Sequence, residues 1–319
     1  MLLFFSERCA KELCLSWQRV WHRDADTCMG QMTHLPCLFS YYLSCSMKDT
    51  RERVGKLYLQ PHHWRVIERL KAAFKDDPRY LALLVGGSLV KGWGGANSDV
   101  DIMLIATEEE YARCIANENF WYYNTEMCDY PGGYVDGKVL DLQFLRDVLQ
   151  KGSEPARAAF TNVIVPFSHI PELEALVRQI PVYQEAEREE KMRAFYSQVQ
   201  MLKWFVGEAE QKQAIYLMAH ATSEMVFYAA RLLLAYNRIL YPYHKWLMRA
   251  VEDAPEKPAT FLELAEALLK QGSAANAQAL WQCITDFHDW NIPFDQGLVR
   301  FMQDSEWNWR TGRAPLQDW

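Results

Sequence analysis

The stretch Leu84-Val85-Gly86-Gly87-Ser88 decides the fold of this chain, because it joins the end of an apolar strand to a glycine-serine turn. After a spacer of ten residues comes a second strand pattern, Asp99-Val100-Asp101-Ile102-Met103-Leu104-Ile105. Successive side chains of a strand point to opposite faces, so Asp99 and Asp101 share one face. Two carboxylates side by side are costly unless a proton or a cation compensates them, and divalent cations such as Mg²⁺ prefer oxygen ligands. The pair therefore predicts a metal site.

Together these residues resemble the signature of the DNA polymerase β-like nucleotidyltransferase superfamily, in particular its small-molecule or kanamycin-type members with a helical C-terminal domain. The resemblance rests on Gly87-Ser88, on Asp99-x-Asp101 and on the small-residue spacer that ends in Ser98. It covers residues 61–145, and its specificity comes from the combination of turn, spacing and strand context. It implies that the glycine-serine turn binds a nucleoside triphosphate and that Asp99 and Asp101 bind Mg²⁺, with Mn²⁺ as the alternative.

The glycine-serine turn suits a phosphate group. Glycine lets backbone N–H groups approach phosphate oxygens that a side chain would block, and a short helix from Leu89 would add its N-terminal dipole. The hydroxyl of Ser88 and the charge of Lys91 would add to the binding, and the resemblance adds Ser98 to the nucleotide-binding residues. Without the aspartate pair, the same residues would also fit a simple tight turn.

A third metal ligand is expected on a neighbouring strand. The dipeptide Asp136-Gly137 predicts a hairpin turn, with the returning strand at 138–144. On that strand Asp141 faces away from Leu140 and Leu142. The resemblance implies a third carboxylate on a strand of this kind, and Asp141 is its match here. It would complete the catalytic one of two metal ions and help to activate the incoming hydroxyl. Asp136 is explained by its turn.

The chain divides into a small mixed-sheet domain and an all-α helical bundle, so the predicted fold class is α+β. An amphipathic helix begins at Pro61, and the nucleotidyltransferase catalytic domain is predicted over residues 47–150. From Pro171 helical periodicity dominates and prolines punctuate it, which predicts a bundle in the acceptor-binding domain, residues 151–319. Its helices are expected near 171–179, 184–207, 212–237, 244–253, 260–271, 274–290 and 296–303.

Two features of the helical half have more than one interpretation. Helix 212–237 is apolar almost all round, yet His220, Glu224 and Arg231 lie on one stripe of it. They predict either a buried ion pair or a catalytic role, with Glu224 or His220 across the cleft as general base or acceptor-binding group. The segment Arg238–Trp246 predicts either a site that stacks a nucleobase and contacts phosphate or a capped helix junction.

Composition limits the partners. The 319 residues carry a formal net charge of −7, and half of them are apolar, a globular balance without the basic excess typical of nucleic-acid-binding proteins. A small-molecule acceptor is therefore favoured over a polynucleotide. No apolar run approaches the ~20 uncharged residues of a membrane span, and the apolar opening is too short for a signal peptide, so a cytoplasmic location is expected.

The first 46 residues are predicted to be a non-native upstream extension that is poorly packed. They hold five of the eight cysteines, but no Cys-x-x-Cys pair occurs there and the spacings fit no zinc site. The segment that begins at Met47 is typical of a natural start.

The sequence thus predicts a metal-dependent nucleotidyltransferase that moves a nucleoside monophosphate, AMP from ATP in the first instance, to an acceptor hydroxyl with release of pyrophosphate. Two Mg²⁺ ions are expected at Asp99, Asp101 and Asp141. Two alternatives stay open. One is a toxin–antitoxin-like member that modifies a protein or a tRNA, and the other is a non-catalytic nucleotide-binding protein of the same fold.

Overall fold

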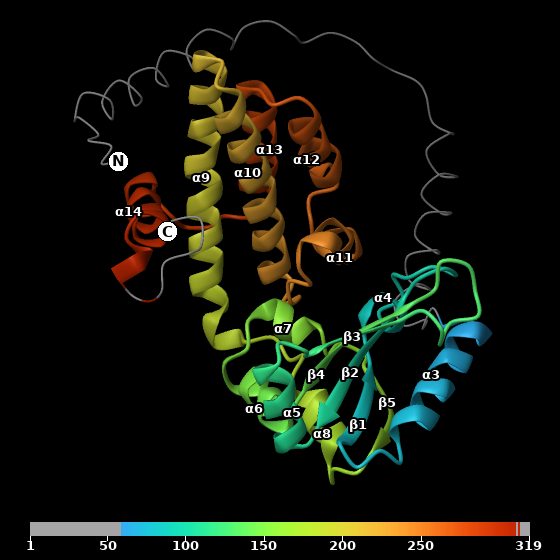
Figure 1. Cartoon of the computed structure of the whole chain (residues 1–319). Coiled ribbons are helices and arrows are strands. Elements are labelled where there is room, and N and C mark those ends of the chain that lie inside the picture. The colour runs from blue at the N-terminus through green and yellow to red at the C-terminus, as the bar shows by residue number, and fades with distance from the viewer. Residues whose placement is uncertain (1–58, 311, 313–319) are drawn as a thin grey trace, which may run out of the picture. The chain divides into compact units, whose positions relative to one another are not determined.

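The computed structural model describes residues 59–310 and residue 312 (Figure 1). All of them belong to one compact unit, Thr50–Trp319. The fold is α+β, as predicted: a five-stranded mixed sheet with its helices is followed by a helical region. The prediction for residues 1–46 lies outside the described residues.

The sheet has the strand order β3-β4-β2-β1-β5. Neighbouring strands are antiparallel except β2 and β4, which run parallel. The strands are β1 (Tyr80–Val85), β2 (Val100–Ala106), β3 (Trp121–Asn124), β4 (Val135–Leu140) and β5 (Ile164–Ser168). The last four residues of β1 are fully buried. This confirms that the apolar run before the glycine turn is a central strand covered on both faces.

The hairpin turn predicted at Asp136-Gly137 is wrong, because both residues lie inside β4. A Cβ atom on Gly137 would lie 2.7 Å from the carbonyl oxygen of Ile102 on β2. Glycine is therefore needed there for the close approach of a neighbouring backbone, which is the other common reason for glycine within a strand. As a result, the sheet gains a parallel pair in which Asp136 lies opposite Asp101.

The domain boundary predicted at residue 150 is too early for the sheet. Strand β5 pairs with β1, on the side of β1 away from β2. Three other residues after position 150, Phe160, Leu173 and Ile180, are buried in the same apolar cluster as Leu84 of β1. A central apolar strand needs a neighbour on each edge and cover on each face, and residues after 150 supply both.

Helices cover both faces of the sheet. Helix α3 (Pro61–Phe74) starts with the predicted proline and packs Ile67 and Leu70 against Leu83 and Leu104. The opposite face of the sheet packs against three further helices and the segments that join them. These are α6 (Leu142–Lys151), α7 (Glu154–Ala158) and α8 (Leu173–Gln179), while α5 (Glu108–Ala116) follows β2.

The helical region is built around two long neighbouring helices, α9 (Arg188–Lys212) and α10 (Ile215–Tyr236) (Figure 1). Four shorter helices follow: α11 (Leu247–Asp253), α12 (Phe261–Lys270), α13 (Ala274–Phe287) and α14 (Phe294–Ser305). Their core includes Met225 and Leu233 of α10 with Phe261 and Leu280. The predicted helical bundle is confirmed. Within the described residues, no helix combines the length and the apolar character that crossing a membrane requires.

A buried carboxylate ties the sheet region to this bundle. Glu154 at the start of α7 is only 6% exposed. Its side chain lies 2.8 Å from Lys191 Nζ of α9 and 3.4 Å from Arg231 Nη2 of α10. It also accepts a hydrogen bond from the backbone N–H of Tyr241 at 3.0 Å. The interpretation of Arg231 as part of an ion pair that ties helices together is therefore confirmed, with Glu154 of α7 as its partner.

Glu154→Gln should lower the free energy of unfolding by about 3–5 kcal/mol, because it removes the counter-charge of the largely buried Arg231 and leaves Lys191 with Glu187 alone. Urea denaturation measures this. The control is Glu174→Gln, which removes an exposed i,i+4 pair with Arg178 and should cost no more than about 0.5 kcal/mol. Equal losses in the two variants would contradict the role assigned to Glu154.

Candidate metal centre

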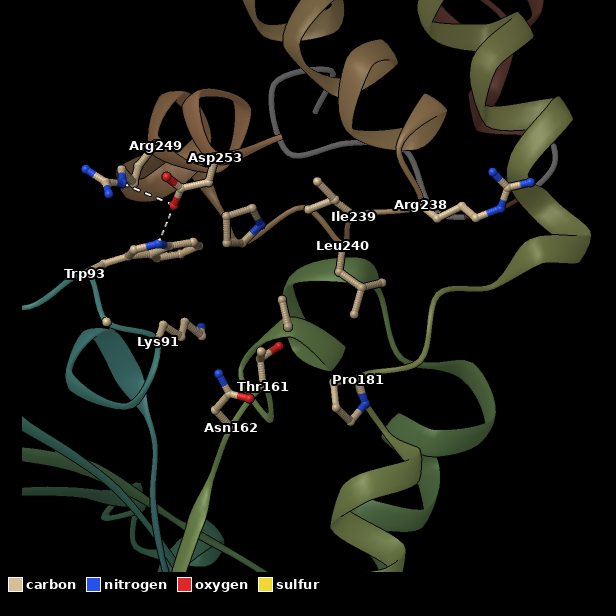
Figure 2. Close-up of a pocket in the computed structure, with 13 residues that line it drawn as sticks. Lys91, Trp93, Thr161, Asn162, Pro181, Arg238, Ile239, Leu240, Arg249 and Asp253 are labelled. Atoms are coloured by element: carbon tan, nitrogen blue, oxygen red, sulfur yellow. Dashed lines mark hydrogen bonds and ion pairs between the residues drawn. The ribbon is translucent and has the colours of Figure 1, made fainter. Parts of the chain in front are cut away.

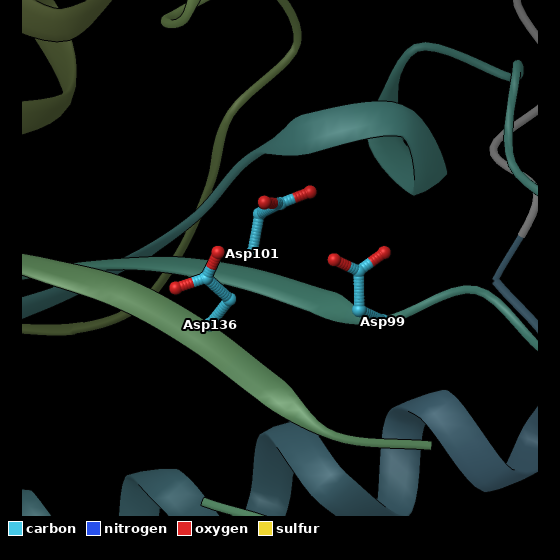
Figure 3. Close-up of side chains that lie close together, drawn as sticks. All are labelled: Asp99, Asp101 and Asp136. Atoms are coloured by element: carbon cyan, nitrogen blue, oxygen red, sulfur yellow. The ribbon is translucent and has the colours of Figure 1, made fainter. Parts of the chain in front are cut away.

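Three carboxylates converge at one end of β2 and β4. Asp99, Asp101 and Asp136 each offer an oxygen atom that lies within 4.8 Å of the other two. Asp99 immediately precedes β2, and Asp101 and Asp136 are partners in the parallel register of β2 and β4. Figure 3 shows the three half-buried side chains turned toward a common space. The structure thus brings the predicted pair, Asp99 and Asp101, together, and Asp136 is the third carboxylate of the cluster.

Asp141, the predicted third ligand, lies outside this cluster. Strand β4 ends at Leu140, and Asp141 is the N-cap of α6. Its Oδ1 accepts the backbone N–H of Phe144 at 2.7 Å. Aspartate is among the best N-cap residues, because its carboxylate satisfies a free N–H group of the first helical turn. This capping role explains Asp141 and corrects its assignment as a metal ligand.

The glycine turn closes directly onto the carboxylates. Gly86 donates its backbone N–H to the carbonyl oxygen of Asp101 at 2.9 Å. Gly87 begins the short helix α4 (Gly87–Val90) with φ +75°, a value that favours glycine. A Cβ atom at Gly87 would lie 1.7 Å from Asp101 Oδ2. Glycine is therefore required here both by the backbone conformation and by contact with a carboxylate of the centre.

The spacer between the turn and β2 is held by its own hydrogen bonds. Ser98 Oγ accepts the N–H of Gly95 at 2.8 Å, and the Ser98 carbonyl accepts the hydroxyl of Tyr130 at 2.7 Å. Ser98 was predicted to bind nucleotide, but these bonds give it a role in shaping the loop that carries Asp99. Trp93 leaves the spacer to pack on the helical core, where its Nε1–H donates to Asp253 Oδ2 at 2.9 Å (Figure 2).

Two aromatic side chains that sequence reasoning missed lie at the carboxylates. Trp121 on β3 donates its Nε1–H to Asp136 Oδ1 at 2.6 Å. An outer hydrogen bond of this kind orients a metal-binding carboxylate. The negative charge of Asp99 is the main cause that raises the pKa of Tyr134. The available signal was the exposed aromatic run at 120–123, but it does not by itself indicate which carboxylate is contacted.

The electrostatics of the cluster show uncompensated negative charge. Burial raises the pKa of Asp101 to about 6, and the charges of Asp99 and Asp136 act in the same direction. The charges of Lys245 and Lys91 oppose this increase. Burial also lowers the pKa of Lys91, while the negative charge of Asp101 acts against that decrease. Three convergent carboxylates are the donor set that Mg²⁺ prefers, and a divalent cation would relieve their repulsion, so the residues fit a metal ion.

A pocket of about 570 Å³ opens onto the centre. Its polar side carries Asp101 and Asp136 together with Gly87 and Lys91. The rest of the wall is largely apolar and aromatic, with Leu140, Phe144, Pro155, Phe160, Pro242 and Tyr243. A smaller cavity of about 340 Å³ shares Lys91 and Pro242 with it and extends between the sheet region and the loop before α11 (Figure 2).

The predicted residues of α10 do not line the pocket at this centre. Glu224 is half-buried and His220 is exposed, with its ring stacked on that of Tyr216 at 6.3 Å. Neither lines the pockets described above, so a position of Glu224 or His220 across from the carboxylates stays a prediction. The segment Arg238–Trp246 does reach the centre, through Pro242 and Tyr243 in the pocket wall and through the charge of Lys245 on Asp101.

Comparison with known proteins finds similarity to solved structures. The chain is similar to a nucleotidyltransferase-like protein from Exiguobacterium sibiricum, with a TM-score of 0.39 and 12% sequence identity. The match covers 78% of this chain and 80% of that one. No protein-family model matches the sequence, and neither does any curated protein.

The raised pKa of Asp101 predicts a pH-dependent effect of Asp101→Asn on the metal-free protein. Between pH 4 and 6 the folded wild type binds more protons than the unfolded chain, so its stability falls as pH rises and stays reduced above pH 6. Asparagine removes this penalty. With EDTA present, the variant should be more stable than the wild type at pH 8 by up to about 3 kcal/mol, and the two should converge below pH 4. Thermal unfolding across pH measures this, and equal stability at pH 8 would contradict the buried, uncompensated cluster.

Proposed function

We propose that this chain is a metal-dependent nucleotidyltransferase that moves a nucleoside monophosphate, with ATP as the first candidate donor, to an acceptor hydroxyl and releases pyrophosphate. The observation that carries the proposal is the cluster of Asp99, Asp101 and Asp136 packed against the glycine turn at Gly87. Convergent carboxylates beside a backbone that a phosphate can approach closely are what metal-assisted phosphoryl transfer needs.

The three carboxylates are the residues that would hold Mg²⁺, or Mn²⁺ in its place, and two ions are expected. When bound, such ions stabilise negative charge on the attacking and leaving oxygens of an in-line displacement. Asp136 takes the place in this scheme that was predicted for Asp141. The hydrogen bond from Trp121 would keep Asp136 oriented for this role.

The protein itself contributes position and charge. The lack of a side chain at Gly87 lets the triphosphate approach the backbone next to Asp101. Lys91 lines the same pocket, where its ammonium group would neutralise phosphate charge. Ser88 is buried beneath the turn at 6% exposure, which supports a structural part for it in addition to the proposed hydroxyl contact. Catalysis of this kind is mainly positioning and electrostatic stabilisation.

A small molecule is the acceptor that the proposal favours. With 34 Lys and Arg against 41 Asp and Glu, the chain has no excess of positive charge for the repeated phosphate contacts that a polynucleotide requires. A pocket of about 570 Å³ lies in the size range of small-ligand sites. A protein or tRNA hydroxyl is the alternative acceptor. Incubation with labelled ATP and cell lysate separates the two, because label enters macromolecules only in the second case.

The exchange of Asp136 for Asp141 as third ligand gives a matched pair of variants. Asp136→Asn should lower the rate of transfer at least about 100-fold, because it removes a metal ligand. Asp141→Asn should leave both rate and stability nearly unchanged, because asparagine caps a helix as well as aspartate does. The measurement is pyrophosphate release in a screen of acceptor hydroxyls with each nucleoside triphosphate and either Mg²⁺ or Mn²⁺.

Two results would overturn the proposal. A large loss of rate in Asp141→Asn with full activity in Asp136→Asn would show that the assignment of Asp136 as the third ligand is wrong. Metal-dependent binding of nucleotide without pyrophosphate release for any acceptor would instead show a non-catalytic nucleotide-binding protein.

A further inference from the structure

Tyr243 has a backbone conformation that is nearly restricted to glycine. Its φ is 80° and its ψ is 167°. The other six non-glycine residues with positive φ among those described lie between 52° and 58°. A bulky residue in the region of Tyr243 is strained, and such strain persists only where the surrounding structure imposes it.

The loop on both sides of Tyr243 imposes this conformation. Tyr241 is 4% exposed, and its N–H donates to the buried carboxylate of Glu154. The Tyr241 ring lies 4.3 Å from the guanidinium of Arg231. Beyond the loop, Leu247 is buried in the core of the helical bundle. With both sides anchored, the strain at Tyr243 cannot relax by a shift of the loop.

Packing of the Tyr243 ring does not explain why tyrosine occupies this position. The ring is 60% exposed. Its ring contacts are with His244 at 4.8 Å and Tyr241 at 6.3 Å, both in its own loop. Glycine would adopt the same backbone without strain. Contacts within the protein therefore do not account for a tyrosine at this position, and its exposed ring is available to a ligand.

The position of Tyr243 indicates what that contact is. Together with Pro242, it forms part of the wall of the pocket that holds Asp101 and Asp136. That pocket has a charged side, with the carboxylates, the glycine turn and Lys91, and an aromatic side, with Phe144 and Tyr243. A ligand that matches both sides carries a polyphosphate at one end and a planar ring at the other, which is the chemistry of a nucleoside triphosphate.

We propose that Tyr243 stacks on the nucleobase of a nucleoside triphosphate bound in this pocket, and that the strained backbone presents its ring to the base. This inference rests on the proposed function, because it takes the triphosphate to lie at the carboxylates and the glycine turn. It adds the residue by which the helical region recognises the nucleotide. It also assigns a role to the segment Arg238–Trp246, whose interpretation as a nucleobase contact the sequence left open.

The test compares Tyr243→Gly with Tyr243→Phe in the full-length chain. Calorimetric titration with Mg²⁺ present uses ATP, GTP, CTP and UTP, and inorganic tripolyphosphate as a probe that has no base. Tyr243→Gly should weaken binding of the preferred nucleotide about tenfold and leave tripolyphosphate binding unchanged, while Tyr243→Phe keeps the wild-type affinity. Because strain is relieved, Tyr243→Gly should also raise the melting temperature by about 2–5 °C.

Glu118→Gly is the matched control. Glu118 also has a positive φ, 53°, but it is exposed and lies in the turn after α5, outside the pocket. This variant should not change the affinity for any of the probes.

The outcomes separate this inference from the proposed function. A wild type that binds neither nucleotide nor tripolyphosphate would overturn both. A Tyr243→Gly variant with wild-type nucleotide affinity would overturn the stacking contact alone, as would equal losses for nucleotide and tripolyphosphate. A lower melting temperature for Tyr243→Gly would contradict the argument from strain.

Discussion

The close packing of like charges at Asp99, Asp101 and Asp136 is the constraint on which the rest of the sheet region depends. Oxygen atoms of all three lie within 4.8 Å of one another, and burial with mutual repulsion raises the pKa of Asp101 to about 6. The parallel pairing of β2 with β4 sets Asp101 opposite Asp136, and Gly87 leaves room for the Asp101 carboxylate. The close packing of these carboxylates thus lowers the stability of the fold at a site that a divalent cation would complete.

Local sequence patterns predicted much of this region. The apolar run at 81–85, the glycine turn and the alternation at 99–105 gave a central strand, a turn and a strand with two carboxylates on one face. The third carboxylate was missed for a physical reason. Asp136-Gly137 is a strong turn signal, whereas the feature that requires Gly137, the close backbone at Ile102, comes from a strand about 35 residues away. Register between distant strands is not visible in local periodicity.

In the helical half, the sequence predicted the helices but not the contacts that they make. Periodicity located α9 and α10, and their charges indicated an ion pair between helices, yet periodicity could not identify Glu154 of α7 as the partner of Arg231. The strain at Tyr243 depends on anchors at Glu154 and in the bundle core, so it follows from the assembled fold and not from the residues near it in sequence. The contacts of this half are therefore set by the tertiary structure, which local periodicity does not reveal.

The most direct test of the central claim is anomalous X-ray scattering from crystals of the protein grown or soaked with Mn²⁺ and a non-hydrolysable ATP analogue. We expect manganese peaks within coordination distance of carboxylate oxygens of Asp99, Asp101 and Asp136, with the triphosphate against the turn at Gly87. Asp141 should remain the cap of α6 and contact no metal. Peaks at Asp141, or no peak at the cluster when Mn²⁺ is saturating, would contradict it.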